Sequence, residues 1–180
     1  MSIEEHNMVK LNDKNKDRYQ TITHPLEPLS RDDSKILILG SFPSVKTREY
    51  GFFYGHPQNR FWLIMDKLFS VSLSKDIEER RNFLLRHKIA VYDSIFQCDI
   101  IGSSDSSIKN VIPSNLSEIF QVGDIKQVFC NGGTSYKYYK KYHAKKSGIE
   151  GVQLPSTSPA NARYSLDDLV AEWEQILEFI

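Results

Sequence analysis

The sequence predicts an α/β fold with a single domain, in which a central parallel sheet of four strands is flanked by helices on both faces. Four short runs rich in apolar residues, at 36–39, 89–92, 127–130 and 152–154, are each followed by glycine, proline or polar residues. Stretches with helical spacing of apolar residues lie between these runs. Such alternation favours parallel strands joined by right-handed crossovers, because each helix returns the chain to the same end of the sheet.

The first apolar run contains only Ile and Leu, and it is ended by Gly40 and Ser41. This composition is typical of a buried strand of a parallel sheet. Segment 54–62, YGHPQNRFW, follows soon after and is dense in aromatic rings, amides and turn residues. Hydrogen-bonding groups beside flat apolar side chains are what a pocket for a planar base requires.

Helices are expected after the strands and at the C-terminus. Apolar residues at helical spacing predict helices over 59–70 and 75–86, and further helices begin near Asn115 and Thr134. The last helix has the clearest pattern, with apolar side chains at i, i+3, i+4 and i+7 from Leu166 onward to the end of the chain. We expect this helix to be structural and to pack on the sheet.

The polar loops should meet at one place. The carboxyl ends of parallel strands share one edge of the sheet, and open α/β sheets bind ligands there. The loops that begin at Gly40, Asn131 and Pro155 should therefore line one cleft, with segment 54–59 over it.

The chain length of 180 residues suits one domain, predicted to span 35–180. Residues 1–34 are mostly polar and are expected to form a lead-in that lies across this domain. Lys plus Arg and Asp plus Glu both number 23, so the formal net charge is zero. This balance argues against a large non-specific surface for nucleic acid, although a small footprint remains compatible with it.

The two cysteines, Cys98 and Cys130, are too few for a disulfide framework and form no CxxC motif, which indicates a reducing, intracellular setting. No apolar stretch reaches the roughly 18 residues of a membrane span. The polar N-terminus shows no secretory signal. We therefore expect a cytoplasmic protein that does not contact a membrane.

Two segments allow two interpretations each. Residues 98–110 form a serine-rich polar connection, which composition assigns to a loose loop rather than to one that contacts phosphates. The helix after Thr134 interleaves tyrosine with lysine over 136–146. This pattern favours an amphipathic helix with half-buried tyrosines over a face that binds nucleic acid.

The motifs exclude several kinds of chemistry. The sequence has no HExxH, no Cys/His cluster, no EF-hand loop, no GxSxG, no Walker motif and no GxGxxG, so we expect neither a metal nor a cofactor. In segment 54–62, His56 is the only side chain that titrates near neutral pH. Amide, hydroxyl, backbone and aromatic groups position a water molecule, hold a leaving group and stack on a flat ring. They suit a bond that already tends to dissociate, such as an N-glycosidic bond.

Four motifs resemble those of the uracil-DNA glycosylase superfamily, most closely its hypoxanthine-DNA (deoxyinosine) glycosylase branch. They are GSFPS at 40–44, YGHPQNRFW at 54–62, NG at 131–132 and LPSTSPANA at 154–162. The resemblance runs from about His24 to the C-terminus. It implies the fold of that superfamily and a monofunctional enzyme of base-excision repair, which hydrolyses the N-glycosidic bond of deoxyinosine in DNA without cutting the strand.

The resemblance also implies roles for individual residues. Asn59 would be the catalytic amide that orients the attacking water. The base would be contacted by Gly40, Ser41, Phe42, Tyr54, His56 and Asn131. The flanking phosphates and the gap left in the base stack would be contacted by Ser44, Ser156, Thr157, Ser158, Pro159, Ala160 and Asn161.

The sequence departs from the superfamily pattern in its first loop. That loop lacks the Asp of the fastest uracil-removing members, and Phe42 stands where the mismatch-directed branch has Asn, which moves the catalytic burden to Asn59. Simpler roles stay open: Asn59 as a helix cap and Asn131 in a turn. His56 is favoured as a structural residue.

Two further ambiguities concern Tyr54, which suits the core as well as base stacking, and two acids. Asp93 and Asp105 are interpreted as solvated loop residues, and neither is assigned as a general base.

Two alternative functions remain beside the main one: a uracil- or mismatch-directed DNA glycosylase, and a damaged-DNA-binding module that performs no chemistry. Under the main hypothesis the partner is DNA that contains deaminated bases. The protein is expected to be a monomer in the cytoplasm, associated with the nucleoid in a prokaryote.

Overall fold

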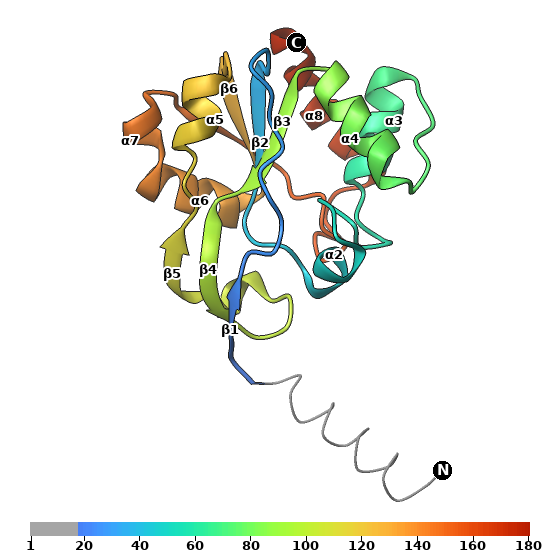
Figure 1. The fold of residues 1–180 in the computed structure, drawn as a ribbon. Coiled ribbons are helices and arrows are strands. Elements are labelled where there is room, and N and C mark those ends of the chain that lie inside the picture. Colours follow the sequence, from blue (N-terminus) through green and yellow to red (C-terminus); the bar gives the residue numbers. More distant parts are fainter. Residues whose placement is uncertain (1–17) are drawn as a thin grey trace, which may run out of the picture.

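The computed structural model describes residues 18–180, and its centre is a parallel sheet of four strands (Figure 1). The predicted α/β fold with a four-stranded parallel sheet is therefore confirmed. The strands pair in the order β3-β2-β6-β7. Their bounds are β2 Ile36–Gly40, β3 Ile89–Asp93, β6 Gln127–Asn131 and β7 Gly151–Leu154.

Strands β2 and β3 are buried along their whole length, as expected of apolar runs covered on both faces. Gly40 lies opposite Asp93 in the register of β2 and β3, and Leu39 lies opposite Cys130 of β6. The last residues of three neighbouring strands, Asp93, Gly40 and Asn131, therefore stand at one edge of the sheet.

Helices cover both faces of the sheet. In Figure 1, α3, α4 and α8 lie on one side, and α5, α6 and α7 lie on the other. Phe61 of α3 and Trp173 of α8 are fully buried, and their rings meet edge to face at 5.8 Å between centroids. The helices are α2 Val45–Tyr50, α3 Phe61–Phe69, α4 Ile77–Arg86, α5 Ser117–Val122, α6 Gly133–Tyr142, α7 Ala144–Ser147 and α8 Leu166–Trp173.

Two features of the helices differ from the prediction. The expected final helix ends at Trp173, and a 3-10 helix, η2 (Glu174–Phe179), completes the chain. Helix α2 was not predicted, because its six residues contain a single aliphatic side chain, Val45, and give no helical stripe.

A second, antiparallel sheet of three strands was also missed. Its order is β1-β4-β5, and the prediction of one polar loop over 98–110 is wrong at both ends because β4 and β5 occupy them. The pairing of β4 with β5 is irregular, with register shifts between Ile95 and Asp99, although apolar and polar residues alternate over 96–100. The bounds are β1 Gln20–Thr23, β4 Ile95–Ile100 and β5 Lys109–Pro113.

The predicted polar lead-in over 1–34 lies partly outside the described residues. Residues 18–34 pack against the sheets: β1 pairs with β4, and Leu29, 2% exposed, exchanges backbone hydrogen bonds with Val91 at 3.0 and 2.9 Å. The division of the chain at residue 34 stays a prediction. Within 18–180 no helix has the length and apolarity that crossing a membrane requires.

Candidate active site

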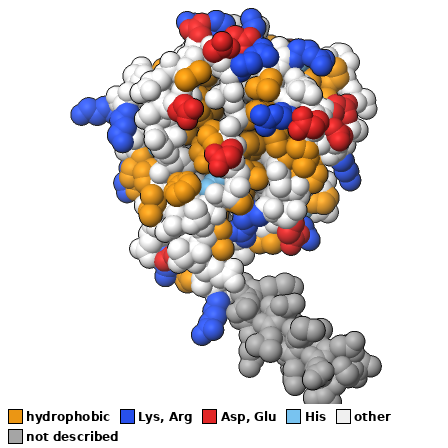
Figure 2. Space-filling model, viewed as in Figure 1, with side chains coloured by type: hydrophobic (Ala, Val, Ile, Leu, Met, Phe, Trp, Pro, Cys, Tyr) orange, Lys and Arg blue, Asp and Glu red, His pale blue; other side chains and the backbone are white. Residues whose placement is uncertain are grey.

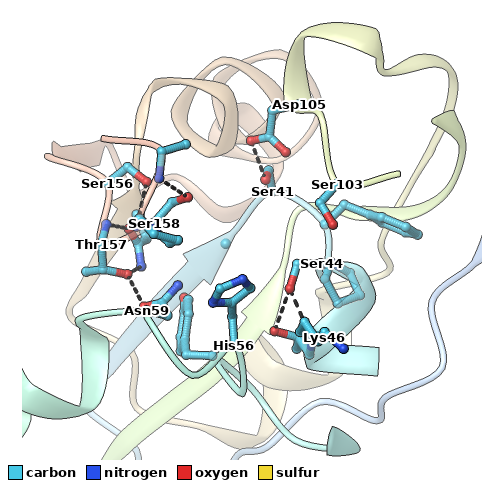
Figure 3. A pocket seen from close by; sticks show the side chains of 18 of the residues that line it. Ser41, Ser44, Lys46, His56, Asn59, Ser103, Asp105, Ser156, Thr157 and Ser158 are labelled. Carbon is cyan, nitrogen blue, oxygen red and sulfur yellow. Dashed lines mark hydrogen bonds between the residues drawn. The ribbon is translucent and has the colours of Figure 1, made fainter. Parts of the chain in front are cut away.

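A cleft of about 640 Å³ opens at the carboxyl edge of the parallel sheet (Figure 3). The first loop, segment 53–59, the end of β3, the loop between β4 and β5, the end of β6 and the loop after β7 all line it. Every residue to which the sequence analysis gave a catalytic, base-binding or DNA-binding role lies in its lining. The convergence of the polar loops is thus observed, whereas the individual roles stay proposals.

Asn59 stands at the start of α3, with its carbonyl oxygen turned toward the protein. That oxygen accepts the Phe61 backbone N–H at 3.0 Å and the Thr157 hydroxyl at 2.8 Å. These two bonds use both lone pairs of the amide oxygen. They also assign the oxygen and nitrogen positions of the Asn59 side chain, because a backbone N–H needs an acceptor. The NH2 group has no partner within residues 18–180 and is left for the cleft. Asn59 therefore caps the helix start and still presents two donors.

Thr157 connects Asn59 to the sheet. Its backbone N–H donates to Asn131 Oδ1 at 2.9 Å, and its hydroxyl accepts from Asn131 Nδ2 at 2.9 Å. Thr157 is fully buried, so its hydroxyl faces Asn59 rather than solvent. The predicted phosphate contact of Thr157 does not fit this placement. Its side chain instead fixes the orientation of the Asn59 amide.

Arg60 anchors the loop that follows β7. Its guanidinium donates to the carbonyl oxygens of Ser158 at 2.8 Å and Asn161 at 2.7 Å, and also to that of Tyr164. Three charge-assisted bonds to one loop make a rigid clamp. No role was predicted for Arg60 from the sequence, although its place directly after Asn59 in the motif is a signal for one.

Several predicted contact residues carry structural hydrogen bonds. Ser44 caps α2 by accepting the Thr47 N–H at 3.1 Å, and His56 Nδ1 accepts the Gln58 N–H at 3.1 Å within its turn. The structural interpretation of His56 agrees with this bond. Phe42, 7% exposed, packs in a small core with β4 and α6 and shows the cleft only part of its ring.

Tyr54 combines a core contact with a polar end. Its ring stacks on Phe61 at 4.1 Å between centroids, and its backbone adopts a left-handed conformation with φ of 55°. The hydroxyl is buried near the Asn131 amide and makes no hydrogen bond of good geometry within residues 18–180. Burial, with a smaller effect from the nearby Asp93 charge, raises the pKa of Tyr54 far above its ordinary value, so the hydroxyl keeps its proton.

Two carboxylates line the cleft, and the interpretation of Asp93 as a solvated loop acid is wrong. Asp93 is 5% exposed, because its side chain lies at the strand end and bonds His24 Nε2 at 2.7 Å. Asp105 stays exposed, but its carboxylate turns into the cleft and accepts the Ser41 hydroxyl at 2.8 Å (Figure 3). The site is therefore more acidic than the motifs alone suggested.

The environment of Asp105 predicts a pH-dependent stability effect. Partial removal from water raises the pKa of this carboxyl above 3.8, the Ser41 hydrogen bond lowers it, and the charge of Asp93 raises it again. The net pKa is raised, so the folded state binds the proton more tightly than the unfolded state. The free energy of unfolding is then reduced as pH rises through 3.8 and above.

We expect Asp105→Asn to raise the urea midpoint of unfolding at pH 7, with the gain vanishing below about pH 3, where the carboxyl is protonated in both states. Asp99→Asn is the matched control with the opposite sign. Hydrogen bonds from Thr21 and Asn110 lower the pKa of Asp99, so its replacement should reduce stability at pH 7. Urea titrations at several pH values measure both effects, and a destabilised Asp105→Asn variant at pH 7 would contradict the expectation.

Within residues 18–180, no cluster of three or more His, Cys, Asp or Glu side chains is arranged to hold a metal ion. The chemistry available in the cleft comes from the Asn59 NH2 group, several hydroxyls, backbone groups, the His56 imidazole, the Lys46 ammonium and two carboxylates. Such a set can bind a flat polar ring, hold a water molecule and stabilise a leaving group by hydrogen bonds.

Comparisons with known proteins agree with this chemistry. The family model described as the uracil DNA glycosylase superfamily matches residues 28–178. A hypoxanthine DNA glycosylase of Methanosarcina acetivorans is 29% identical over 81% of this chain and 91% of its own length. One of Methanosarcina barkeri is 31% identical over 82% of this chain and 93% of its own.

A solved structure gives the same match. The solution NMR structure of a candidate uracil DNA glycosylase from Methanosarcina acetivorans superposes with a TM-score of 0.73 at 26% identity. The match covers 87% of this chain and 96% of that one. The similarity therefore extends over most of both chains.

Proposed function

This chain belongs to the uracil DNA glycosylase superfamily, and we propose that it is a DNA glycosylase that hydrolyses the N-glycosidic bond of hypoxanthine in deoxyinosine. The observation that carries the proposal is the meeting of Asn59 with the loop after β7 in one cleft, through Thr157 and Arg60. A volume of about 640 Å³ lies in the range of small-molecule sites and accommodates one nucleotide turned out of the helix.

In the proposed reaction, water attacks C1′ of the sugar as the bond to the base breaks. The departing hypoxanthine takes up the proton that the attacking water loses. The hydroxyl group stays on C1′, and an abasic site remains in the strand. The Asn59 NH2 group would hold the oxygen of the attacking water as a donor, because its carbonyl oxygen is already occupied. Backbone groups at Gly40 and Ser41 would contact the base and sugar, and donors aimed at the departing base would stabilise its developing charge.

The proposed DNA contacts are local. Ser44, Ser156 and Ser158 would contact the phosphates that flank the flipped nucleotide. Pro159 and Ala160 are exposed beside Asn161 and would fill the gap in the stack, held in place by the Arg60 clamp. Figure 2 shows acidic and basic side chains interspersed on one face of the molecule, in keeping with recognition through a small footprint rather than a broad basic surface. We also propose that the protein acts as a cytoplasmic monomer, at the nucleoid in a prokaryote.

The decisive test is a glycosylase assay on oligonucleotides that carry hypoxanthine, uracil, xanthine or mispaired thymine at one position. We expect free hypoxanthine and a strand that breaks only after alkali, since no lysine nucleophile is proposed. Release of uracil or thymine without hypoxanthine would favour the uracil- or mismatch-directed alternative. Tight binding of the damaged DNA without an alkali-labile product would favour the non-catalytic module.

A further inference from the structure

The floor of the cleft is built around a glycine. Asp93, Gly40 and Asn131 end the neighbouring strands β3, β2 and β6, and all three line the cleft. A Cβ placed on Gly40 would lie 2.1 Å from Asp93 Oδ1 and 3.5 Å from the Tyr54 hydroxyl. The Asp93 carboxylate therefore occupies the space that a side chain at position 40 would take, at the centre of the sheet edge.

His24 holds this carboxylate from behind. His24 Nε2 lies 2.7 Å from Asp93 Oδ2, and the two side chains are 0% and 7% exposed. His24 Nδ1 lies against the backbone of Leu26, 3.1 Å from its nitrogen and 3.0 Å from its oxygen. Because a carboxylate only accepts, Nε2 is the donor to Asp93. One carboxylate oxygen is thus fixed, and Oδ1 is left without a partner within residues 18–180.

The other acceptors at the floor are engaged. The Asn59 carbonyl oxygen receives two hydrogen bonds, and Asn131 Oδ1 receives the Thr157 N–H. Among the described residues of the floor, Asp93 Oδ1 is therefore the charged acceptor that is left open to a base; the other carboxylate of the cleft, Asp105, stands on the loop between β4 and β5 and accepts the Ser41 hydroxyl. A charged acceptor that is largely removed from water requires a donor, and leaving it unpaired in a complex is costly.

We propose that Asp93 Oδ1 accepts the N1–H of the flipped base, and that this contact selects bases with a lactam N–H over adenine. Hypoxanthine carries a donor at N1, whereas adenine carries a lone pair there that would face the carboxylate. The contact that binds the deaminated base thus repels its parent base. Uracil, guanine and thymine also carry a lactam N–H, so the contact separates a deaminated base from the amino base it derives from, hypoxanthine from adenine or uracil from cytosine, and does not by itself reject guanine or thymine. His24 is the positioning residue, and the inference rests on the proposed function.

Binding to uncleavable DNA tests the inference separately from catalysis. Oligonucleotides carry 2′-fluoro-2′-deoxyinosine or 2′-fluoro-2′-deoxyadenosine opposite an abasic spacer. Neither base is then paired, so no base pair has to be broken when the base flips out. We expect the full-length wild-type protein to bind the inosine oligonucleotide roughly 10- to 100-fold more tightly, the effect of one hydrogen bond to a charged group. Asp93→Asn should reduce this preference to about 3-fold or less, because an amide can pair with either base.

Asp99→Asn, on the neighbouring sheet, is the control and should keep the wild-type preference. His24→Ala should weaken the preference, and His24→Gln, whose amide can still donate to Asp93, should restore it. If His24 had only a structural role, the ratio of the affinities for the inosine and adenosine oligonucleotides would not change. An absent preference in the wild type, or one that persists in Asp93→Asn, overturns the inference.

The N1–H contact can also be tested with the wild-type protein alone, which keeps the test valid if Asp93→Asn does not fold. The wild type should bind an N1-methylated inosine analogue no better than adenosine, and binding equal to that of inosine overturns the proposal. Cleavage of inosine by the wild type reports on the proposed function. A cleaving enzyme without the binding preference would refute the inference alone.

Discussion

Asn59→Ala is expected to lower the single-turnover rate of hypoxanthine release by about 100- to 1,000-fold, the effect of removing one donor that stabilises a transition state. The affinity for DNA should change little, because the proposed phosphate contacts come from other residues. The variant also leaves the Thr157 hydroxyl and the Phe61 N–H without their acceptor. We therefore expect it to lose about 1–3 kcal/mol of stability, measurable by urea unfolding.

Two further variants separate the catalytic role from the helix cap. Gln58→Ala changes an exposed neighbour that does not line the cleft, and it should keep wild-type activity. Asn59→Asp keeps an acceptor for Phe61 and Thr157 but replaces the free NH2 group with an oxygen. It should fold like the wild type and remain as inactive as Asn59→Ala. An active Asn59→Asp would mean that the position needs an acceptor, and the donor role would be wrong.

The parts of the fold that follow from local sequence could be predicted. The buried run at 36–39 and the polar residues after each strand carry their signal in a few adjacent positions, and the parallel arrangement then places the loops in one cleft. Strand β4 was missed although Phe96, Cys98 and Ile100 alternate with Gln97 and Asp99, because the residues from Cys98 onward were assigned to the serine-rich loop that follows.

The site residues that were missed depend on pairing across the chain. His24 and Asp93 are separated by 69 positions, and nothing in the composition around either residue indicates that they meet. Asp105 looks like an ordinary residue of a serine-rich loop until its bond to Ser41 is seen. Motif resemblance identified residues of the cleft wall and also Gly40 and Asn131 of its floor, whereas the Asp93 carboxylate became visible as a floor residue only from the packing of β3 against β2.

Gly40→Ala is expected to damage both stability and activity, because the added Cβ would lie 2.1 Å from Asp93 Oδ1. The carboxylate cannot simply swing away, since His24 holds its other oxygen and the pair is buried. We expect a loss of about 1–3 kcal/mol in the free energy of unfolding, typical of an overpacked core. Base release should fall by roughly 100-fold, because the displaced carboxylate loses the N1–H contact that we infer.

A double-mutant cycle tests whether the clash with Asp93 is the cause. In an Asp93→Ala background the obstructing oxygen is gone, so Gly40→Ala should cost less than about 0.5 kcal/mol of additional stability, and the two changes should couple strongly. Gly133→Ala is the control glycine. Its added Cβ would approach only the Gln153 amide at 3.4 Å, and alanine favours the helix that starts there. If Gly40→Ala destabilises the Asp93→Ala background as much as the wild type, position 40 is glycine for a reason unrelated to the carboxylate, and the account of the cleft floor is wrong.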